Sequence, residues 1–171
     1  MKVLVLSDSH GSFANMEAAL KKLSERISAV IHLGDFDYDA ERIRQLCPGL
    51  PVYAVRGNNE YGSEGPLELT LTFNGAKVFC AHGNRHGVYY GLTRLLYAAE
   101  EAEAGTALFG HTHRPLCVRE DGILIMNPGS ISRPRGGKPS FGILDISENG
   151  TVRGSVMEVW GNEDFRPAAY A

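Results

Sequence analysis

The chain has 171 residues, of which 43% are hydrophobic and 22% charged, and its formal net charge is −3. These values are typical of a globular protein and predict a single domain over residues 1–171, large enough to bury a core without disulfides. They argue against a disordered chain, against a membrane-spanning protein because no apolar run is long enough, and against long nucleic acid as a partner because Lys and Arg form no basic block.

The first half of the chain alternates short apolar strands with amphipathic helices. Strands are predicted over residues 2–6, 29–33 and 52–55, with helices over about 13–27 and 39–46 between them. Asp39 is expected to cap the second helix, and Pro48-Gly49 to end it. Apolar strands separated by helices indicate parallel pairing in a covered sheet, whose ligands gather at the carboxyl ends of the strands.

The second half is richer in strands. Residues 67–73 and 77–81 are expected to form a hairpin around Asn74-Gly75, a strong turn signal. A strand is predicted over 106–109, and further hairpins around Asp121-Gly122 and Asn149-Gly150. Between them, an apolar helical face is predicted with Tyr89, Tyr90, Leu92, Leu95, Leu96 and Ala99 on or beside it. Core packing is expected for most of these side chains, with a homo-oligomer interface as the alternative.

Three cysteines, Cys47, Cys80 and Cys117, are widely spaced and form no C-x-x-C pair. We expect buried free thiols in a reducing compartment. The apolar run at the N-terminus ends at Leu6, which is too short for a signal peptide. The sequence therefore predicts a cytoplasmic protein with small molecules as its partners.

Five polar clusters each follow a predicted strand. In chain order they are Asp8-Ser9-His10, Gly34-Asp35, Gly57-Asn58, His82-Gly83 and His111-Thr112-His113. Residues two apart in an extended segment face the same side, so each D-x-H or H-x-H pair can converge on one region. Each cluster alone is typical of a turn or a packed histidine, but five at strand ends indicate a shared metal site. Oxygen ligands mixed with imidazole suit Mn, Fe or Zn.

This series, D-x-H, G-D, G-N-x-E, H-G and G-H-x-H, resembles the signature of the calcineurin-like metallophosphoesterases. The short length, and Asn127-Pro128-Gly129-Ser130 after the last histidine motif, resemble the family's small YfcE-like phosphodiesterase branch. The resemblance extends over residues 3 to about 145, which is nearly the whole chain.

The resemblance implies an α/β fold, a four-layer α/β/β/α sandwich of two mixed sheets, with two divalent metal ions per chain at the sheet ends. Manganese is the expected metal, with Fe, Zn, Ni or Mg as alternatives. Carried over by position, one ion would be held by Asp8, His10, Asp35 and His113, and the other by Asp35, Asn58, His82 and His111. Asp35, Asn58 and His82 would act in catalysis through the metals and a metal-activated hydroxide. The implied reaction is hydrolysis of a small-molecule phosphodiester.

The sequence departs from the family after the G-N motif. Asn59 stands where many members have a histidine that protonates the leaving group. An amide cannot act as a general acid, and such acids contribute about 10²–10⁴-fold, so we expect slow turnover of esters with poor leaving groups. Asn59 remains a candidate substrate contact, and Glu60 is interpreted as a turn or surface carboxylate.

Other polar residues are open to two interpretations. Asn84 stands where the branch often has a histidine, and His86 is interpreted as an exposed loop residue, with replacement of that histidine as the alternative. His32, inside an apolar strand, is expected to be structural. Arg133 and Arg135 follow the N-P-G-S motif and belong either to a solvated loop or to a loop beside the metals that meets substrate phosphate.

The leading hypothesis is therefore a phosphodiesterase. A phosphomonoesterase is the alternative within the same chemistry. A metal-binding scaffold resembling the small retromer subunit is the alternative outside it, because fold does not settle function. A nuclease is a weaker hypothesis, since the chain has no added DNA-binding domain. The complete set of imidazoles favours catalysis, whereas Asn59 favours the scaffold.

Overall fold

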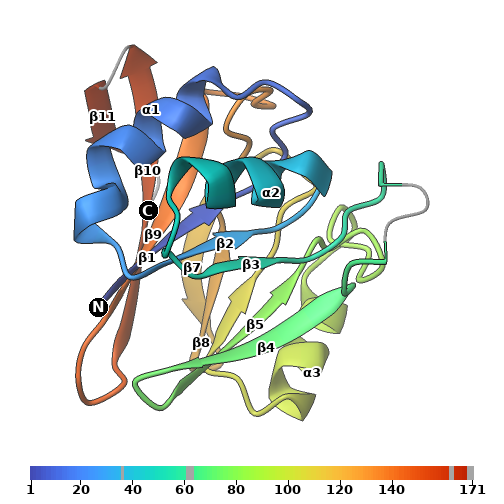
Figure 1. Ribbon diagram of the computed structural model, residues 1–171. Coiled ribbons are helices and arrows are strands. Elements are labelled where there is room, and N and C mark those ends of the chain that lie inside the picture. Colours follow the sequence, from blue (N-terminus) through green and yellow to red (C-terminus); the bar gives the residue numbers. More distant parts are fainter. Residues whose placement is uncertain (36, 61–63, 162–163, 169–171) are drawn as a thin grey trace.

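The computed structural model describes residues 1–35, 37–60, 64–161 and 164–168. Two β-sheets pack face to face, and helices lie on the outer face of each sheet, as Figure 1 shows. This arrangement confirms the expected four-layer α/β/β/α sandwich.

The first sheet has six strands in the order β11-β10-β9-β1-β2-β3. Its strands are β1 (Lys2–Leu6), β2 (Ala29–His32), β3 (Val52–Ala54), β9 (Ser140–Ile146), β10 (Val152–Gly161) and β11 (Asp164–Pro167). β1, β2 and β3 run parallel, as the alternating pattern predicted, and β9 lies antiparallel to β1. The three parallel strands therefore end at the same edge of the sheet.

The second sheet has five strands in the order β4-β5-β6-β8-β7. Its strands are β4 (Glu68–Phe73), β5 (Ala76–Ala81), β6 (Thr106–Leu108), β7 (Leu116–Glu120) and β8 (Ile123–Asn127). The predicted hairpin turns are confirmed at Asn74-Gly75, with φ of 48° and 81°, and at Asp121-Gly122, with φ of 48° and 83°. Two successive positive φ angles match the right-handed twist of paired strands.

Helices α1 (Ala14–Leu23) and α2 (Asp37–Leu46), with the short 3₁₀ helix η1 (Ser24–Arg26), cover the six-stranded sheet, and α3 (Thr93–Glu101) covers the other. A central core fills the space between the sheets, where Val5, Val78 and Met126 are fully buried. Strands such as β1 and β2 are covered on one face by this core and on the other by helices, which explains why their sequences are nearly continuous apolar runs.

Two helix boundaries differ from the prediction. α2 begins at Asp37, so Asp39 lies inside the helix and does not cap it; its side chain instead faces His32. α3 begins at Thr93, so Tyr89 and Leu92 precede it. Leu95, Leu96 and Ala99 are buried and Leu92 packs against them, so core packing is confirmed for most of the predicted face. Tyr89 and Tyr90 are the exceptions, because both are exposed.

Cys80 and Cys117 are buried, and Cys47 is half-buried, all three as free thiols. Burial raises the pKa of each thiol, so none has the lowered pKa of a reactive cysteine. Within the described part of the chain, no helix is long and apolar enough to cross a membrane.

Candidate metal centre

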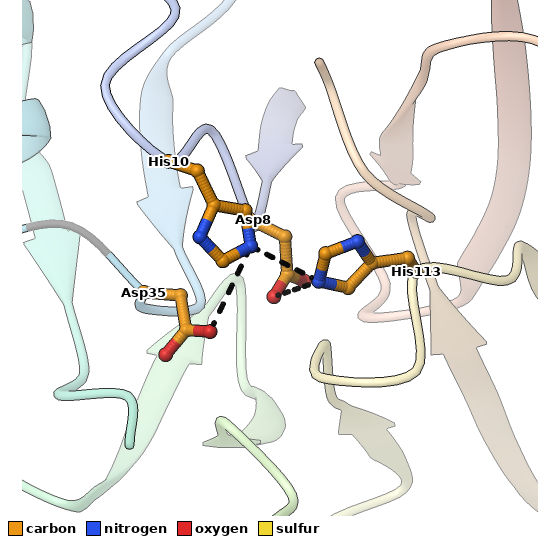
Figure 2. Close-up of side chains that lie close together, drawn as sticks. All are labelled: Asp8, His10, Asp35 and His113. Atoms are coloured by element: carbon orange, nitrogen blue, oxygen red, sulfur yellow. Dashed lines mark hydrogen bonds and ion pairs between the residues drawn. The ribbon is translucent and has the colours of Figure 1, made fainter. Parts of the chain in front are cut away.

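Four side chains that follow three different strands meet at the edge of the two sheets. Asp8 and His10 follow β1, Asp35 follows β2 and His113 follows β6. One ligand atom from each lies within 4.8 Å of the others. Figure 2 shows the four side chains pointing toward one another. The Nε2 atoms of His10 and His113 are 3.1 Å apart, and Nε2 of His113 is 3.2 Å from Oδ1 of Asp8.

The backbone at this edge is strained. Asp8, His10, Asp35, His111 and His113 all have φ between 47° and 72°, a left-handed conformation that residues other than glycine rarely adopt. Such conformations cost about 1–3 kcal/mol each and cluster at functional sites. Five of them among the seven predicted ligands indicate that the fold sacrifices stability to aim these side chains at one point.

Asp8 is fully buried and ionised. Burial by itself would raise its pKa, but hydrogen bonds from His113 and Ser7 and the charge of His82 outweigh burial, so the pKa of Asp8 is lowered. Its Oδ2 accepts hydrogen bonds from the Ser7 hydroxyl at 2.6 Å and from the backbone N–H of His111 at 3.0 Å. Its Oδ1 faces the cluster.

The hydrogen bonds of the histidines decide which ring nitrogens face the cluster. Nδ1 of His113 lies 2.6 Å from the carbonyl of Arg133, and Nδ1 of His82 lies 2.7 Å from the carbonyl of Leu33. Each Nδ1 therefore carries the proton, and in a neutral ring Nε2 presents a lone pair to the cluster. A buried carboxylate and imidazole nitrogens that converge on one point fit a metal ion.

Asp35 lies between two groups of ligand candidates. Its Oδ2 is 3.9 Å from Nε2 of His10, and its Oδ1 is 3.3 Å from Nε2 of His82. The backbone N–H groups of Asn58 and Asn59 donate to Oδ1, and the side-chain amide of Asn59 donates to Oδ2 at 2.6 Å. These donors hold the carboxylate in one orientation.

The second group completes the predicted set. Nε2 of His82 is 3.1 Å from Oδ1 of Asn58, and the rings of His82 and His111 are 5.0 Å apart. Burial lowers the pKa of His111 and of His10, which favours the neutral, ligating form of both rings. The structure thus places Asn58, His82 and His111 beside the four-residue cluster, with Asp35 in contact with both groups.

Glycines beside the ligands are required sterically. A Cβ atom on Gly57 would lie 2.2 Å from Oδ1 of Asp35, and one on Gly110 would lie 2.0 Å from the hydroxyl of Ser7. Real Cβ atoms do not approach other atoms so closely, so each glycine lets the backbone pass directly over a carboxylate region of the centre.

The structure gives the contacts or the exposure of four polar residues whose roles the sequence did not decide. The Glu60 carboxylate accepts a hydrogen bond from the N–H of Gly57 at 3.0 Å, which confirms a turn carboxylate. The interpretation of His86 as an exposed loop residue was wrong: only 10% of its side chain is exposed, and Nε2 lies 3.3 Å from a carboxylate oxygen of Glu68. Asn84 is exposed. His32 is buried and structural, as expected.

The loop after β8 lies beside the metal centre. Hydroxyls of Ser130 and Ser132 donate to the carbonyls of Asp8 and Ser9, at 2.7 and 2.5 Å, and the Arg133 carbonyl meets His113. Sequence reasoning assigned no site role to these serines, and it expected Tyr89 in the core or at an oligomer interface. The N-P-G-S motif was the signal for the first of them, whereas nothing in the sequence indicated Tyr89.

Comparison with known proteins agrees with this geometry. A family model described as the calcineurin-like phosphoesterase superfamily domain matches residues 1–149. A probable metallophosphoesterase of Bacillus subtilis, YsnB, is 34% identical over 95% of this chain and 94% of its own length. The phosphodiesterase MJ0936 of Methanocaldococcus jannaschii is 26% identical, covering 92% of this chain and all of the relative.

Solved structures share the fold. The Vps29 protein of Entamoeba histolytica, crystallised with zinc, superimposes with a TM-score of 0.81 over 98% of this chain and 97% of its own. At 20% identity this similarity shows a common architecture and nothing about activity.

Proposed function

The chain belongs to the calcineurin-like phosphoesterase superfamily and is a metal-dependent phosphoesterase, and we propose that it hydrolyses small phosphodiesters at a centre of two divalent ions. The observation that carries the proposal is the position of Asp35, whose two carboxylate oxygens face different histidines. A bridging carboxylate between two sets of ligands has this arrangement.

The proposed ligands follow from that division. Asp8, His10, Asp35 and His113 would hold one ion, and Asp35, Asn58, His82 and His111 the other. When bound, two ions would neutralise charge on a phosphate ester and lower the pKa of a coordinated water. Asp35, Asn58 and His82 would be the catalytic residues in the sense that they hold and orient these ions.

Asn59 occupies the position from which a general acid would protonate the leaving group. The side-chain amide of Asn59 donates to Asp35 and cannot release a proton near neutral pH. Among the described residues of the metal centre, no group stands in for the general acid expected at this position. Phenolic esters, whose leaving groups need no proton, are therefore the better substrates.

Manganese is the proposed metal, because the ligand set mixes carboxylate and amide oxygens with four imidazoles. Mn, Fe and Zn all accept such sets, whereas Mg prefers oxygen ligands alone. Ni remains a further alternative to be tested directly.

Two alternatives are distinguished by measurement. A phosphomonoesterase would prefer p-nitrophenyl phosphate over bis-p-nitrophenyl phosphate. A scaffold would bind metal but hydrolyse neither ester. The strained backbone at five ligand candidates favours catalysis over the scaffold. A scaffold binds its partner through the protein surface and gains nothing from backbone strain at the metal centre.

The deciding experiment removes metal with a chelator and assays both esters after Mn²⁺, Zn²⁺, Ni²⁺ or Mg²⁺ is restored. Asp35→Asn should abolish diester hydrolysis, whereas Asp145→Asn, the same change at an exposed strand position, should not. Two bound ions per chain with no hydrolysis under any metal would overturn the enzyme in favour of the scaffold. A preference for the monoester would make the protein a phosphomonoesterase and leave the proposed metal centre unchanged.

A further inference from the structure

The loop of residues 130–135 brings two arginines to the rim of the metal centre. Its backbone is fixed there, because the carbonyl of Arg133 accepts from His113 Nδ1 at 2.6 Å and the N–H of Arg135 donates to the carbonyl of His113 at 3.0 Å. Both arginine side chains are exposed. The loop therefore lies beside the candidate metal centre, while contact between its arginines and a substrate phosphate stays a prediction.

Tyr89 holds the side chain of Arg135. Nη1 of Arg135 donates a hydrogen bond to the Tyr89 hydroxyl, which in turn donates to the carbonyl of His111 at 3.1 Å. The guanidinium carbon lies 5.6 Å from the centre of the Tyr89 ring, within the range of a cation–π interaction. The same ring meets His111 edge-on at 4.9 Å. Arg135 is thereby connected to His111 through Tyr89 and to His113 through its backbone.

Arg133 and Arg135 form no ion pair with the described residues. Within the part of the chain that the structure describes, no carboxylate lies at ion-pair distance from Arg133 or Arg135. By contrast Arg42, Arg44 and Arg166, in α2 and β11, each pair with an acidic side chain. A protein with net charge −3 thus places two positive charges beside its metal centre that no described carboxylate pairs.

The guanidinium of Arg135 contacts Tyr89 and, among the described residues, no side chain of the metal centre. Its charge therefore lies at the rim of the centre, where it can meet an anion without taking part in the proposed ligand set.

We propose that Arg135, positioned by Tyr89, binds a second phosphate group of the substrate, so that the preferred substrates are phosphodiesters that also carry a phosphate monoester. This inference rests on the proposed function, which assigns the scissile phosphate to the metal ions. The planar guanidinium can bind two phosphate oxygens at once. The half-exposed ring of Tyr89 offers an apolar surface to the organic group that joins the two phosphates.

A matched pair of substrates tests the proposal. Thymidine 5′-(p-nitrophenyl phosphate) and its 3′-phosphorylated form have the same scissile bond and leaving group and differ only in the second phosphate. The 3′-phosphate should lower KM about tenfold in the metal-loaded wild-type protein, the size of a charge-assisted hydrogen-bond pair at an exposed site. kcat should be nearly equal for the two, because the second phosphate is remote from the reacting bond.

Variants of Arg135 and Tyr89 test whether these residues cause the lower KM of the 3′-phosphorylated substrate. Arg135→Gln should remove the difference in KM between the two substrates, and leave KM for the unphosphorylated one within about twofold. Tyr89→Phe, which deletes the hydroxyl and keeps the ring, should reduce the preference part of the way, because Arg135 loses its anchor. Arg26→Gln is the matched control: Arg26 is an exposed arginine in η1, before the amino end of β2, and its loss should change neither KM.

A binding measurement separates failure of this inference from failure of the proposed function. Calorimetry should show thymidine 3′,5′-bisphosphate binding more tightly than thymidine 5′-phosphate, with the difference lost in Arg135→Gln. That result would support the second-phosphate site even if neither ester were hydrolysed. Active enzyme with equal KM for both substrates would overturn it. So would an equal rise in both KM values in Arg135→Gln, because Arg135 would then bind the scissile phosphate.

Discussion

Nε2 of His32 lies 2.8 Å from Oδ2 of Asp39, and both side chains are almost completely buried. His32 Nδ1 accepts a hydrogen bond from the N–H of Gly34 at 3.2 Å, so the proton of the neutral ring is on Nε2, the nitrogen that lies near Asp39. The pair therefore joins the end of β2 to α2 across the turn that contains Asp35. Asp35 lies between these two elements in the chain, so we expect the pair to help fix its position.

Asp39→Asn should weaken metal binding as well as the fold. An uncharged amide is a poorer partner for the His32 ring than the carboxylate, and leaving a buried polar group without its partner costs about 1–3 kcal/mol of stability. We also expect about tenfold weaker metal affinity, as for other residues that orient a ligand. Calorimetric titration of Mn²⁺ and thermal melting of the metal-free protein measure the two effects. Glu41→Gln, on the same helix but in an exposed ion pair, should change neither. Unchanged metal affinity in Asp39→Asn would limit the pair to a structural role.

Gly57→Ala should inactivate the enzyme. The added Cβ would lie 2.2 Å from Oδ1 of Asp35 and 2.4 Å from its backbone nitrogen, so the carboxylate must move. A displacement of about 1 Å in such a centre costs on the order of 100-fold in rate. Diester hydrolysis under saturating metal measures it. Gly105→Ala is the control, because a Cβ there meets open space. Wild-type activity in Gly57→Ala would show that Asp35 need not occupy its present position.

The missing general acid predicts a steep dependence on the leaving group. Across a series of diesters, the rate should fall sharply as the leaving alcohol becomes less acidic, because Asn59 cannot supply a proton. Asn59→His should raise the rate for alkyl relative to phenolic leaving groups, by up to the 10²–10⁴-fold that a general acid contributes. A flat dependence in the wild-type protein would mean that another group donates the proton.

Metal affinity should increase with pH. The hydrogen bond with Asp8 raises the pKa of His113 in the metal-free protein, and a metal ion must displace that proton. Below this raised pKa, affinity should fall about tenfold per pH unit, and above it the dependence should flatten. Calorimetry in buffers of different ionisation enthalpy would detect the released proton.

The same shift affects the stability of the metal-free protein. Because the folded-state pKa of His113 lies above its unfolded value, its contribution is complete below the unfolded value and is lost as the pH rises through the folded value. Thermal melting should therefore show that the stabilisation by added metal grows over this window. A pH-independent increment would indicate that His113 is not a ligand.

Several features could be predicted from the sequence because their causes are local. Asn74-Gly75 and Asp121-Gly122 form hairpin turns through their own backbone preferences, and the apolar runs between them become strands. The five polar clusters lie together because parallel strands end at one edge of their sheet. Periodicity was less informative about the ends of elements: Tyr89 and Leu92 continue the apolar pattern of α3 but precede it.

Contacts between distant segments were decided by the tertiary structure alone. Nothing in the sequence pairs Tyr89 with Arg135, His86 with Glu68 or Asp39 with His32, because each pairing depends on which loops the two sheets bring together. The sequence by itself determined which chemical groups stand at the strand ends and in what order. The packing of the two sheets determined their orientation and the residues that hold them, since a side chain's partner is set by its distance in space and not by its position along the chain.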